Sequence, residues 1–131
     1  GVSAGENNKQ NFIKKYKFNI CSESSISNGY ITEKIFECLI AGCIPIYYCN
    51  NDVMIESNII NNDFIIKYNN SNAKDVAEKI SHIDSHPELY KQFINSKPLT
   101  NDAYDNIIKY YDDFKFKILQ YININDYNNI W

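Results

Sequence analysis

The sequence predicts an α/β fold, in which a parallel sheet is flanked by helices in a Rossmann-like arrangement. Short apolar segments typical of strands alternate with longer segments whose apolar residues recur at helical spacing. At 131 residues the chain has the size of one domain. Its hydrophobic fraction of 44% and aromatic fraction of 15% indicate a folded globule rather than a disordered chain.

The first predicted strand is Phe18–Cys21, a short apolar segment that follows a lysine-rich stretch. Residues 22–29 are polar and contain glycine, which indicates a loop. Thr32 is then expected to be the N-cap of a helix, and Gly42 is expected to end that helix. The apolar stripe of the helix is formed by Ile35, Phe36, Leu39 and Ile40.

A second strand is predicted at Ile44–Tyr48, with Pro45 near its start, where a missing N–H is tolerated. A third strand is predicted at residues 64–68. An Asn/Ser turn follows this strand, and Asn72 is expected to cap the next helix. The apolar positions of that helix are Val76, Ala77, Ile80 and Ile83.

Two further helices complete the predicted fold. Residues 85–88 (Ser-His-Pro-Glu) predict a capping box that opens a helix through Phe93. The last helix is predicted from Ala103 to about Tyr121, and we expect its tyrosine and phenylalanine residues to be core rather than a surface on which sugars stack. Its apolar residues are Ile107, Ile108, Tyr111, Phe114, Ile118 and Leu119.

Charge and cysteine content exclude several classes of function. The net charge is −3 and all 13 basic residues are lysines, so nucleic acid is not expected as a partner. The four cysteines show no C-x-x-C spacing and no nearby histidine, which argues against a zinc site. We expect reduced cysteines in the core, although an even number leaves disulfides open. No apolar run approaches the roughly 20 residues that a membrane-spanning helix needs.

The segment 30–34 (Tyr-Ile-Thr-Glu-Lys) carries the clearest indication of chemistry. It places Lys34 in the first turn of a helix, where the positive end of the helix dipole disfavours a cation. A bound anion such as a phosphate would explain this lysine, and Glu33 could then accept hydrogen bonds from sugar hydroxyls. The alternative is a solvated Glu-Lys pair, the usual state of such charges on a helix. The loop 22–29 and residues 49–52 follow neighbouring strands, where ligands bind in parallel sheets.

Three segments in this order carry a resemblance to a known family. They are residues 16–24, residues 30–35 (Tyr-Ile-Thr-Glu-Lys-Ile) and residues 41–47 (Ala-Gly-Cys-Ile-Pro-Ile-Tyr). Together they resemble the donor-binding segment of the α1,3/4-fucosyltransferases. That resemblance implies the C-terminal half of a two-domain GT-B enzyme, which transfers fucose from GDP-fucose with inversion. It is densest over residues 16–49 and becomes a compatible pattern to about residue 110.

The resemblance also implies roles for particular residues. Glu33 would hold the ribose hydroxyls of GDP, and Lys34 would hold the diphosphate. Tyr30 would line the nucleotide pocket, Glu23 would lie near the donor sugar, and Thr32 would belong to the same donor-binding set. GDP-fucose would be the donor substrate, and no metal or other cofactor would be required.

The sequence departs from the family pattern at Ser22, Ser24 and Cys49. The family's catalytic base and a phosphate-binding arginine lie upstream, so we expect the catalytic base and the contacts to the glycan acceptor in an N-terminal domain that this sequence lacks. We divide the chain into residues 1–15, a boundary segment or linker, residues 16–122, a nucleotide-sugar-binding Rossmann-like domain, and residues 123–131, an Asn-rich tail.

Two alternatives to this hypothesis stay open. The chain could be half of a GT-B transferase that uses another nucleotide sugar. It could also be a non-catalytic nucleotide-binding or interaction module with a decayed site. A cytoplasmic location is favoured, with a Golgi membrane as the alternative if a longer parent protein carries an N-terminal anchor.

Overall fold

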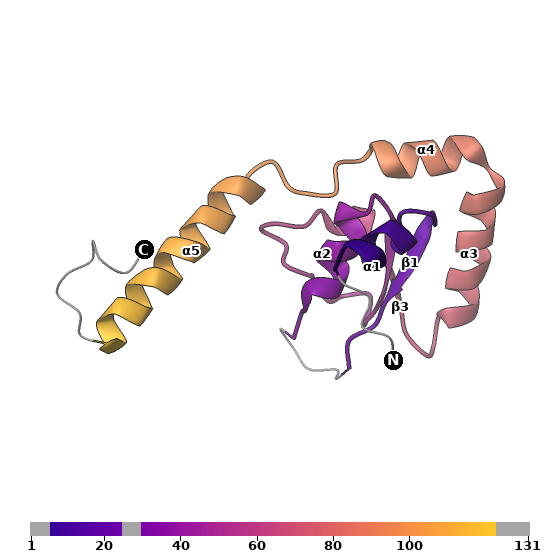
Figure 1. Cartoon of the computed structure of the whole chain (residues 1–131). Coiled ribbons are helices and arrows are strands. Elements are labelled where there is room, and N and C mark those ends of the chain that lie inside the picture. The colour runs from indigo at the N-terminus through magenta and orange to yellow at the C-terminus, as the bar shows by residue number, and fades with distance from the viewer. Residues whose placement is uncertain (1–5, 25–29, 123–131) are drawn as a thin grey trace.

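The computed structural model describes residues 6–24 and 30–122 (Figure 1). In these ranges the chain forms a parallel sheet with helices on both of its faces, as the sequence predicts. In chain order the elements are α1 (Glu6–Ile13), β1 (Phe18–Cys21), α2 (Glu33–Ile40), β2 (Ile44–Tyr48), the 3-10 turn η1 (Asn62–Phe64), β3 (Ile66–Tyr68), α3 (Ala73–Ser85), α4 (Pro87–Asn95) and α5 (Ala103–Ile122).

The three strands are parallel and lie in the order β1-β2-β3. Cys21 pairs with Tyr47, and Tyr48 pairs with Tyr68, so the carboxyl ends of the strands lie along one edge of the sheet. The first crossover runs through α2, which packs against both β1 and β2. This topology brings the loop after β1 and the start of α2 to the edge where parallel sheets bind ligands.

Side chains alternate between two hydrophobic cores because successive strand residues point to opposite faces of the sheet. Cys21 and Tyr47 join one core with α1 and α2. Ile44 and Ile66 join the other core with α3 and α4. Burying an isoleucine fully contributes about 1.5–3 kcal/mol. The two cores therefore fix the sheet against the helices on both sides.

The structure confirms the predicted end of α2. Ala41 occupies the C-cap, and Gly42 follows with φ of +77°, in the left-handed region that glycine adopts without steric cost. Cys43 N donates a hydrogen bond back to Cys38 O at 3.1 Å, which closes the turn into β2. In the apolar stripe, Ile35 is fully buried, but Ile40 is 66% exposed. The stripe prediction was therefore wrong at its last position.

Two predicted boundaries differ from the structure. The third strand begins at Ile66 rather than at residue 64, because the side chain of Asn61 accepts a hydrogen bond from Asp63 N and starts the η1 turn. The capping box at residues 85–88 is absent. Ser85 ends α3 and donates its hydroxyl to Ser81 O at 2.8 Å, so Pro87 opens α4 without a side-chain cap.

The N-terminal segment adds a helix to the domain. Residues 1–15, expected to be a boundary segment or linker, contain α1. Ile13 at its end is only 6% exposed and belongs to the core shared with α2. The hydrogen bonds from Cys43 Sγ to Ile13 O (3.2 Å) and Tyr16 O (3.0 Å) also hold this segment. Because α1 is mostly polar, its sequence gives no periodic signal of packing, and its contact with the core depends on Ile13 alone among its described side chains.

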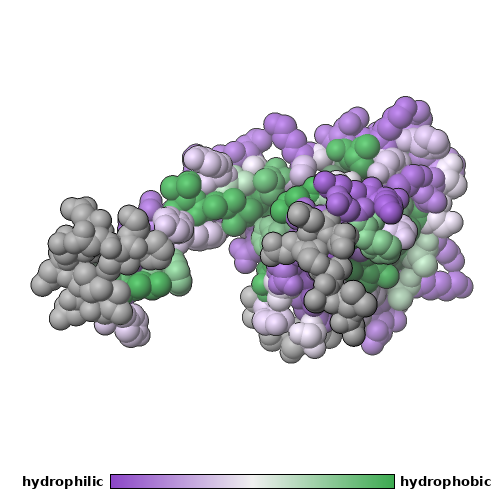
Figure 2. Space-filling model, in the orientation of Figure 1, coloured by the Kyte–Doolittle hydropathy of each residue, from purple (hydrophilic) through white to green (hydrophobic). Residues whose placement is uncertain are grey.

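The last helix has the predicted bounds but not the predicted burial. Figure 1 shows α5 projecting away from the sheet, and Figure 2 shows hydrophobic side chains along it. Phe114 is 60% exposed and Phe116 is 56% exposed, so our expectation that these aromatic residues are core was wrong. The attachment lies near the start of α5, where Ala103 is buried and Asn106 Nδ2 donates to Asn58 O at 2.8 Å.

Candidate functional site

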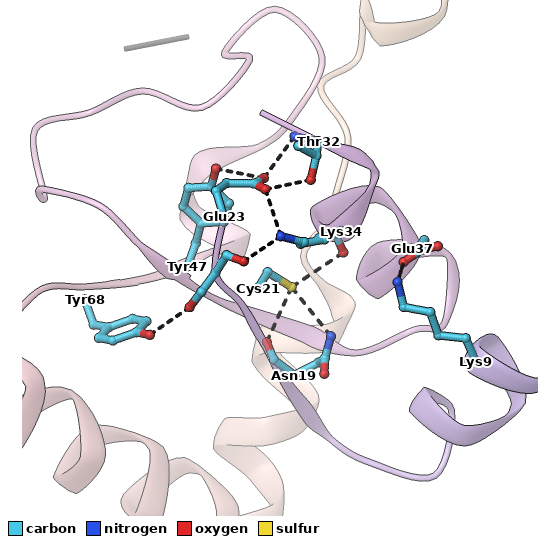
Figure 3. A network of polar contacts seen from close by, with 10 residues as sticks. Lys9, Asn19, Cys21, Glu23, Thr32, Lys34, Glu37, Tyr47 and Tyr68 are labelled. Carbon is cyan, nitrogen blue, oxygen red and sulfur yellow. Dashed lines mark hydrogen bonds and ion pairs between the residues drawn. The ribbon is translucent and has the colours of Figure 1, made fainter. Parts of the chain in front are cut away.

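The candidate site lies where β1 ends and α2 begins, at the carboxyl edge of the sheet. Figure 3 shows the polar network that connects them. Its centre is Glu23, whose side chain is only 6% exposed. Glu23 Oε1 accepts from Thr32 N at 2.9 Å, and Oε2 accepts from Thr32 Oγ1 at 2.6 Å. Tyr47 contributes a third donor, since its hydroxyl lies 3.3 Å from Glu23 Oε1.

Lys34 completes this network from the first turn of α2. Its Nζ donates to Ser22 O at 2.9 Å and lies 3.4 Å from Glu23 Oε2. The Lys34 side chain is 35% exposed, compared with 6% for Glu23. The ammonium is therefore fixed by protein oxygens on one side and accessible to solvent on the other.

The network keeps the Glu23 carboxylate ionised. Burial alone would raise the pKa of Glu23, but the hydrogen bonds from Thr32 and the charge of Lys34 outweigh burial and hold that pKa below its usual value. The same contacts act in the opposite direction on Tyr47. Burial and the neighbouring Glu23 charge raise the pKa of the Tyr47 hydroxyl, which therefore remains a proton donor at neutral pH.

The anion that Lys34 was expected to need is supplied by the chain itself. Thr32 occupies the N-cap position with extended backbone, but its side chain does not cap α2. Instead, Thr32 donates both its backbone N–H and its hydroxyl to Glu23. A carboxylate at a helix start interacts favourably with the helix dipole. The sequence places Glu33 beside Lys34, and the structure identifies Glu23 as the acidic partner of Lys34.

Of the five residues predicted for the donor site, the structure brings Glu23, Thr32 and Lys34 into contact. Tyr30 is 44% exposed and Glu33 is also exposed, and neither joins the described network. Tyr30 precedes α2 and Glu33 begins it, and both side chains are exposed. Their predicted contacts to a nucleotide remain predictions.

Sequence reasoning missed the tyrosines of this edge. Tyr47 bonds Glu23, and the Tyr68 hydroxyl lies 3.1 Å from Ser22 Oγ. Tyr68 also packs edge-on against Tyr48, with ring centroids 5.1 Å apart. The signal was available in the two predicted strands, because a parallel register places the end of the second strand beside the end of the first. In the sequence-based prediction, Tyr47, Tyr48 and Tyr68 are only strand residues, and their hydroxyl groups have no role in the site.

The buried cysteines pack next to the site, and one of them contacts the first turn of α2. All four are free and buried, as expected for reduced core thiols. Cys21 Sγ donates to Lys34 O at 3.6 Å, and so links β1 to the first turn of α2. In residues 6–24 and 30–122, no group of three or more His, Cys, Asp or Glu side chains could hold a metal ion.

Asparagines connect the loops that follow β2 and β3 at the same edge. Asn69 Nδ2 lies 3.3 Å from Asn50 Oδ1, and Asn72 Nδ2 lies 3.1 Å from Asn51 Oδ1. Asn72 was expected to cap α3, but its Oδ1 accepts from Asn69 N at 2.7 Å, and no side-chain cap forms. These amide pairs hold the two loops together beside the candidate site.

Comparison with known proteins decides the family. The sequence model described as glycosyltransferase family 10 (fucosyltransferase), C-terminal part, matches residues 2–101. The matched range contains the whole Glu23–Lys34 network and all three strands. The chain belongs to glycosyltransferase family 10.

Individual relatives agree with this assignment, since their names are those of fucosyltransferases. The chain is 29% identical over 110 residues to an alpha-(1,3)-fucosyltransferase of Helicobacter pylori, a match that covers 84% of this chain and 22% of that protein. It is 34% identical over 87 residues to a GDP-fucose protein O-fucosyltransferase 3 of Xenopus laevis, covering 65% of this chain and 18% of the relative.

A solved structure confirms the fold. The crystal structure of an α1,3-fucosyltransferase with GDP superimposes with a TM-score of 0.54 at 29% identity, over 76% of this chain and 29% of that chain. The predicted fold class, a Rossmann-like sheet from the C-terminal half of a GT-B glycosyltransferase, is thereby confirmed. This family 10 domain spans about a fifth of the length of the relatives it matches. In its described part, no helix is long and apolar enough to cross a membrane.

Proposed function

We propose that this chain is the donor-binding domain of an inverting fucosyltransferase that transfers fucose from GDP-fucose to a glycan acceptor. The observation that carries the proposal is the fixed Lys34 ammonium at the start of α2, on the carboxyl edge of a parallel sheet. The family match over residues 2–101 and the GDP-bound structural neighbour support the choice of nucleotide.

Lys34 is assigned to the diphosphate. An ammonium presents three N–H donors, and Ser22 O and Glu23 occupy one side of it. The solvent-facing side can donate to a phosphate oxygen. The same contact stabilises the charge that develops on GDP as the bond to fucose breaks, so donor binding and leaving-group departure use one residue. No additional cofactor is required in this proposal.

The other predicted residues take complementary roles. Glu33 is exposed one residue before Lys34, so its carboxylate can accept hydrogen bonds from both ribose hydroxyls. Tyr30 offers an exposed ring to the nucleotide. Thr32 and Glu23 contribute by positioning, because they hold the start of α2 and the Lys34 ammonium near the donor sugar.

The acceptor site belongs to another part of the enzyme. Inverting transfer needs a base that takes the proton of the acceptor hydroxyl while that oxygen attacks from the side opposite the leaving diphosphate. Among the described acidic groups of the network, Glu23 is saturated with donors and its pKa is lowered, which makes it a poor base. Following what the family resemblance implies, we assign the base and the acceptor contacts to an N-terminal domain.

A nucleotide panel tests the proposal. The 131-residue chain is titrated calorimetrically with GDP-fucose, GDP, UDP-glucose, ADP-glucose and guanosine. Preferential binding of GDP and GDP-fucose is the expected result. Preference for another sugar nucleotide would favour a different GT-B transferase, and binding of none of them would favour a non-catalytic module.

A further inference from the structure

The Lys34 ammonium already has an anionic partner before any donor arrives. Glu23 Oε2 lies 3.4 Å from Lys34 Nζ at the helix start that a phosphate would otherwise occupy. This carboxylate is buried and holds Thr32 through two hydrogen bonds. A buried carboxylate with this many donors is costly to move, because its lone pairs would lose their partners.

We propose that Glu23 is a resident anion that competes with the donor diphosphate for Lys34, and so sets how tightly the site holds phosphate. The inference rests on the proposed function and deepens it. Lys34 is the partner that a ligand can reach, because its side chain is 35% exposed, whereas the Glu23 side chain is 6% exposed and bonded to Thr32 and Tyr47.

The competition follows from charge. A diphosphate that approaches Lys34 also approaches the Glu23 carboxylate, and two anions near one ammonium repel each other. Part of the attraction between Lys34 and the diphosphate is therefore cancelled. When GDP leaves, Glu23 recovers the full ion pair with Lys34, which favours release of the product without any change in the fold.

Glu23→Gln tests the proposal, with inorganic pyrophosphate as the probe. Glutamine keeps the length of the side chain and an oxygen for Thr32 but removes the negative charge. We expect Glu23→Gln to bind pyrophosphate at least threefold more tightly than the parent chain. Glu37→Gln is the matched control, because it also removes one negative charge, but at a position of α2 where Glu37 pairs with Lys9 instead of Lys34. Its affinity should change less than twofold.

Two further measurements make the test decisive. In a Lys34→Ala background, the gain from Glu23→Gln should shrink, since the part that comes from competition for Lys34 is lost. In the unmutated chain, ¹³C NMR should show the pKa of the Glu23 carboxyl rising when pyrophosphate saturates the site, because ligand binding and ionisation are reciprocally linked. This second readout holds even if the variant unfolds.

The outcomes separate this inference from the proposed function. Equal or weaker pyrophosphate binding by folded Glu23→Gln, an unchanged Glu23 pKa in the complex, or no pyrophosphate binding by the parent chain would each overturn the inference. A chain that binds pyrophosphate with the expected Glu23 effect, but does not prefer GDP over other nucleoside diphosphates, would contradict the proposed function and support the resident anion.

Discussion

At the scale of single residues, Lys34 combines a fixed ammonium with a face open to solvent. We predict that Lys34→Ala weakens GDP binding by about 1.5–3 kcal/mol, the usual value of a hydrogen bond to a charged group. Calorimetric titration of parent and variant measures the loss. Lys9→Ala is the control, because it also removes one positive charge, but from α1, where Lys9 pairs with Glu37 of α2. Equal affinity of the Lys34 variant and the parent would remove Lys34 from the site.

Glu33 provides a second prediction at this scale. Its exposed carboxylate is assigned to the ribose, so Glu33→Gln should weaken GDP binding more than pyrophosphate binding. The comparison of the two ligands by calorimetry isolates the ribose contact. Equal losses for both ligands would indicate a weakened helix start instead, since Glu33 also interacts with the helix dipole.

Glu23 should make the domain sensitive to acid. Its pKa is lowered in the folded chain, so its contribution to the free energy of unfolding is present above the ordinary pKa of about 4.5 and is lost as pH falls through the folded value. Urea denaturation at several pH values from 7 to 3 measures this dependence. We expect a steeper loss of stability below pH 4.5 in the parent than in Glu23→Gln. Parallel curves would show that other carboxyl groups dominate.

The residues of the site differ in how far the sequence could predict them. Lys34 stood out because a cation in the first turn of a helix needs an anion nearby. Its actual partner could not be found in the same way. The contact between Glu23 and Lys34 depends on how β1 packs against α2 and on the path of the intervening loop, and neither appears in local patterns.

At the scale of elements, the burial of an aromatic side chain, rather than the type of element that carries it, decides how much it contributes to the free energy of unfolding. We predict that Phe64→Ala lowers the free energy of unfolding by about 3–5 kcal/mol, because Phe64 is 5% exposed and packs against Phe93 with ring centroids 5.9 Å apart. Phe114→Ala is the matched control, with an expected loss near zero, because Phe114 is 60% exposed on α5. Chemical denaturation compares the two. Similar losses would show that α5 packs as firmly as η1.

Apolar periodicity predicted β1, β2 and the extent of α5, because these segments have clear alternation or helical spacing. It failed where side chains of asparagine and serine redirect the backbone. Asn61 starts η1 inside the predicted third strand, and Ser85 bonds back into α3 instead of capping α4. Such local hydrogen bonds compete with regular structure and leave no periodic signal.

At the scale of the whole molecule, the proposed function makes this chain the donor-binding half of a cleft. We predict that the 131-residue chain binds GDP or GDP-fucose weakly and transfers no fucose, whereas a longer parent protein does. The physical reason is that transfer needs a base and contacts to the acceptor, which the proposed function assigns to another domain. A radiochemical assay with labelled GDP-fucose measures transfer. Fucosylated acceptor formed by this chain above the rate of hydrolysis in buffer would locate a base within it.

The exposure of α5 is the feature that sequence reasoning at this scale predicted worst. The helix has an apolar stripe, and a stripe normally indicates a face packed on the core. In the described residues, its first turn joins the core cluster through Ala103, and Leu119 near its end is also buried, but its aromatic side chains are exposed. The family model matches residues 2–101 and ends just before α5 begins, so that match does not bear on where this helix lies.

The buried cysteine thiols allow transient opening of the folded chain to be measured by chemical labelling. Cys21, Cys38, Cys43 and Cys49 are all shielded from solvent, so a thiol-reactive dye can reach them only through transient opening. Cys21 lies beneath Lys34 and Cys49 lies after β2, which places them at separate parts of the edge. Their individual labelling rates would therefore resolve how often each part of the edge opens, with no engineered label.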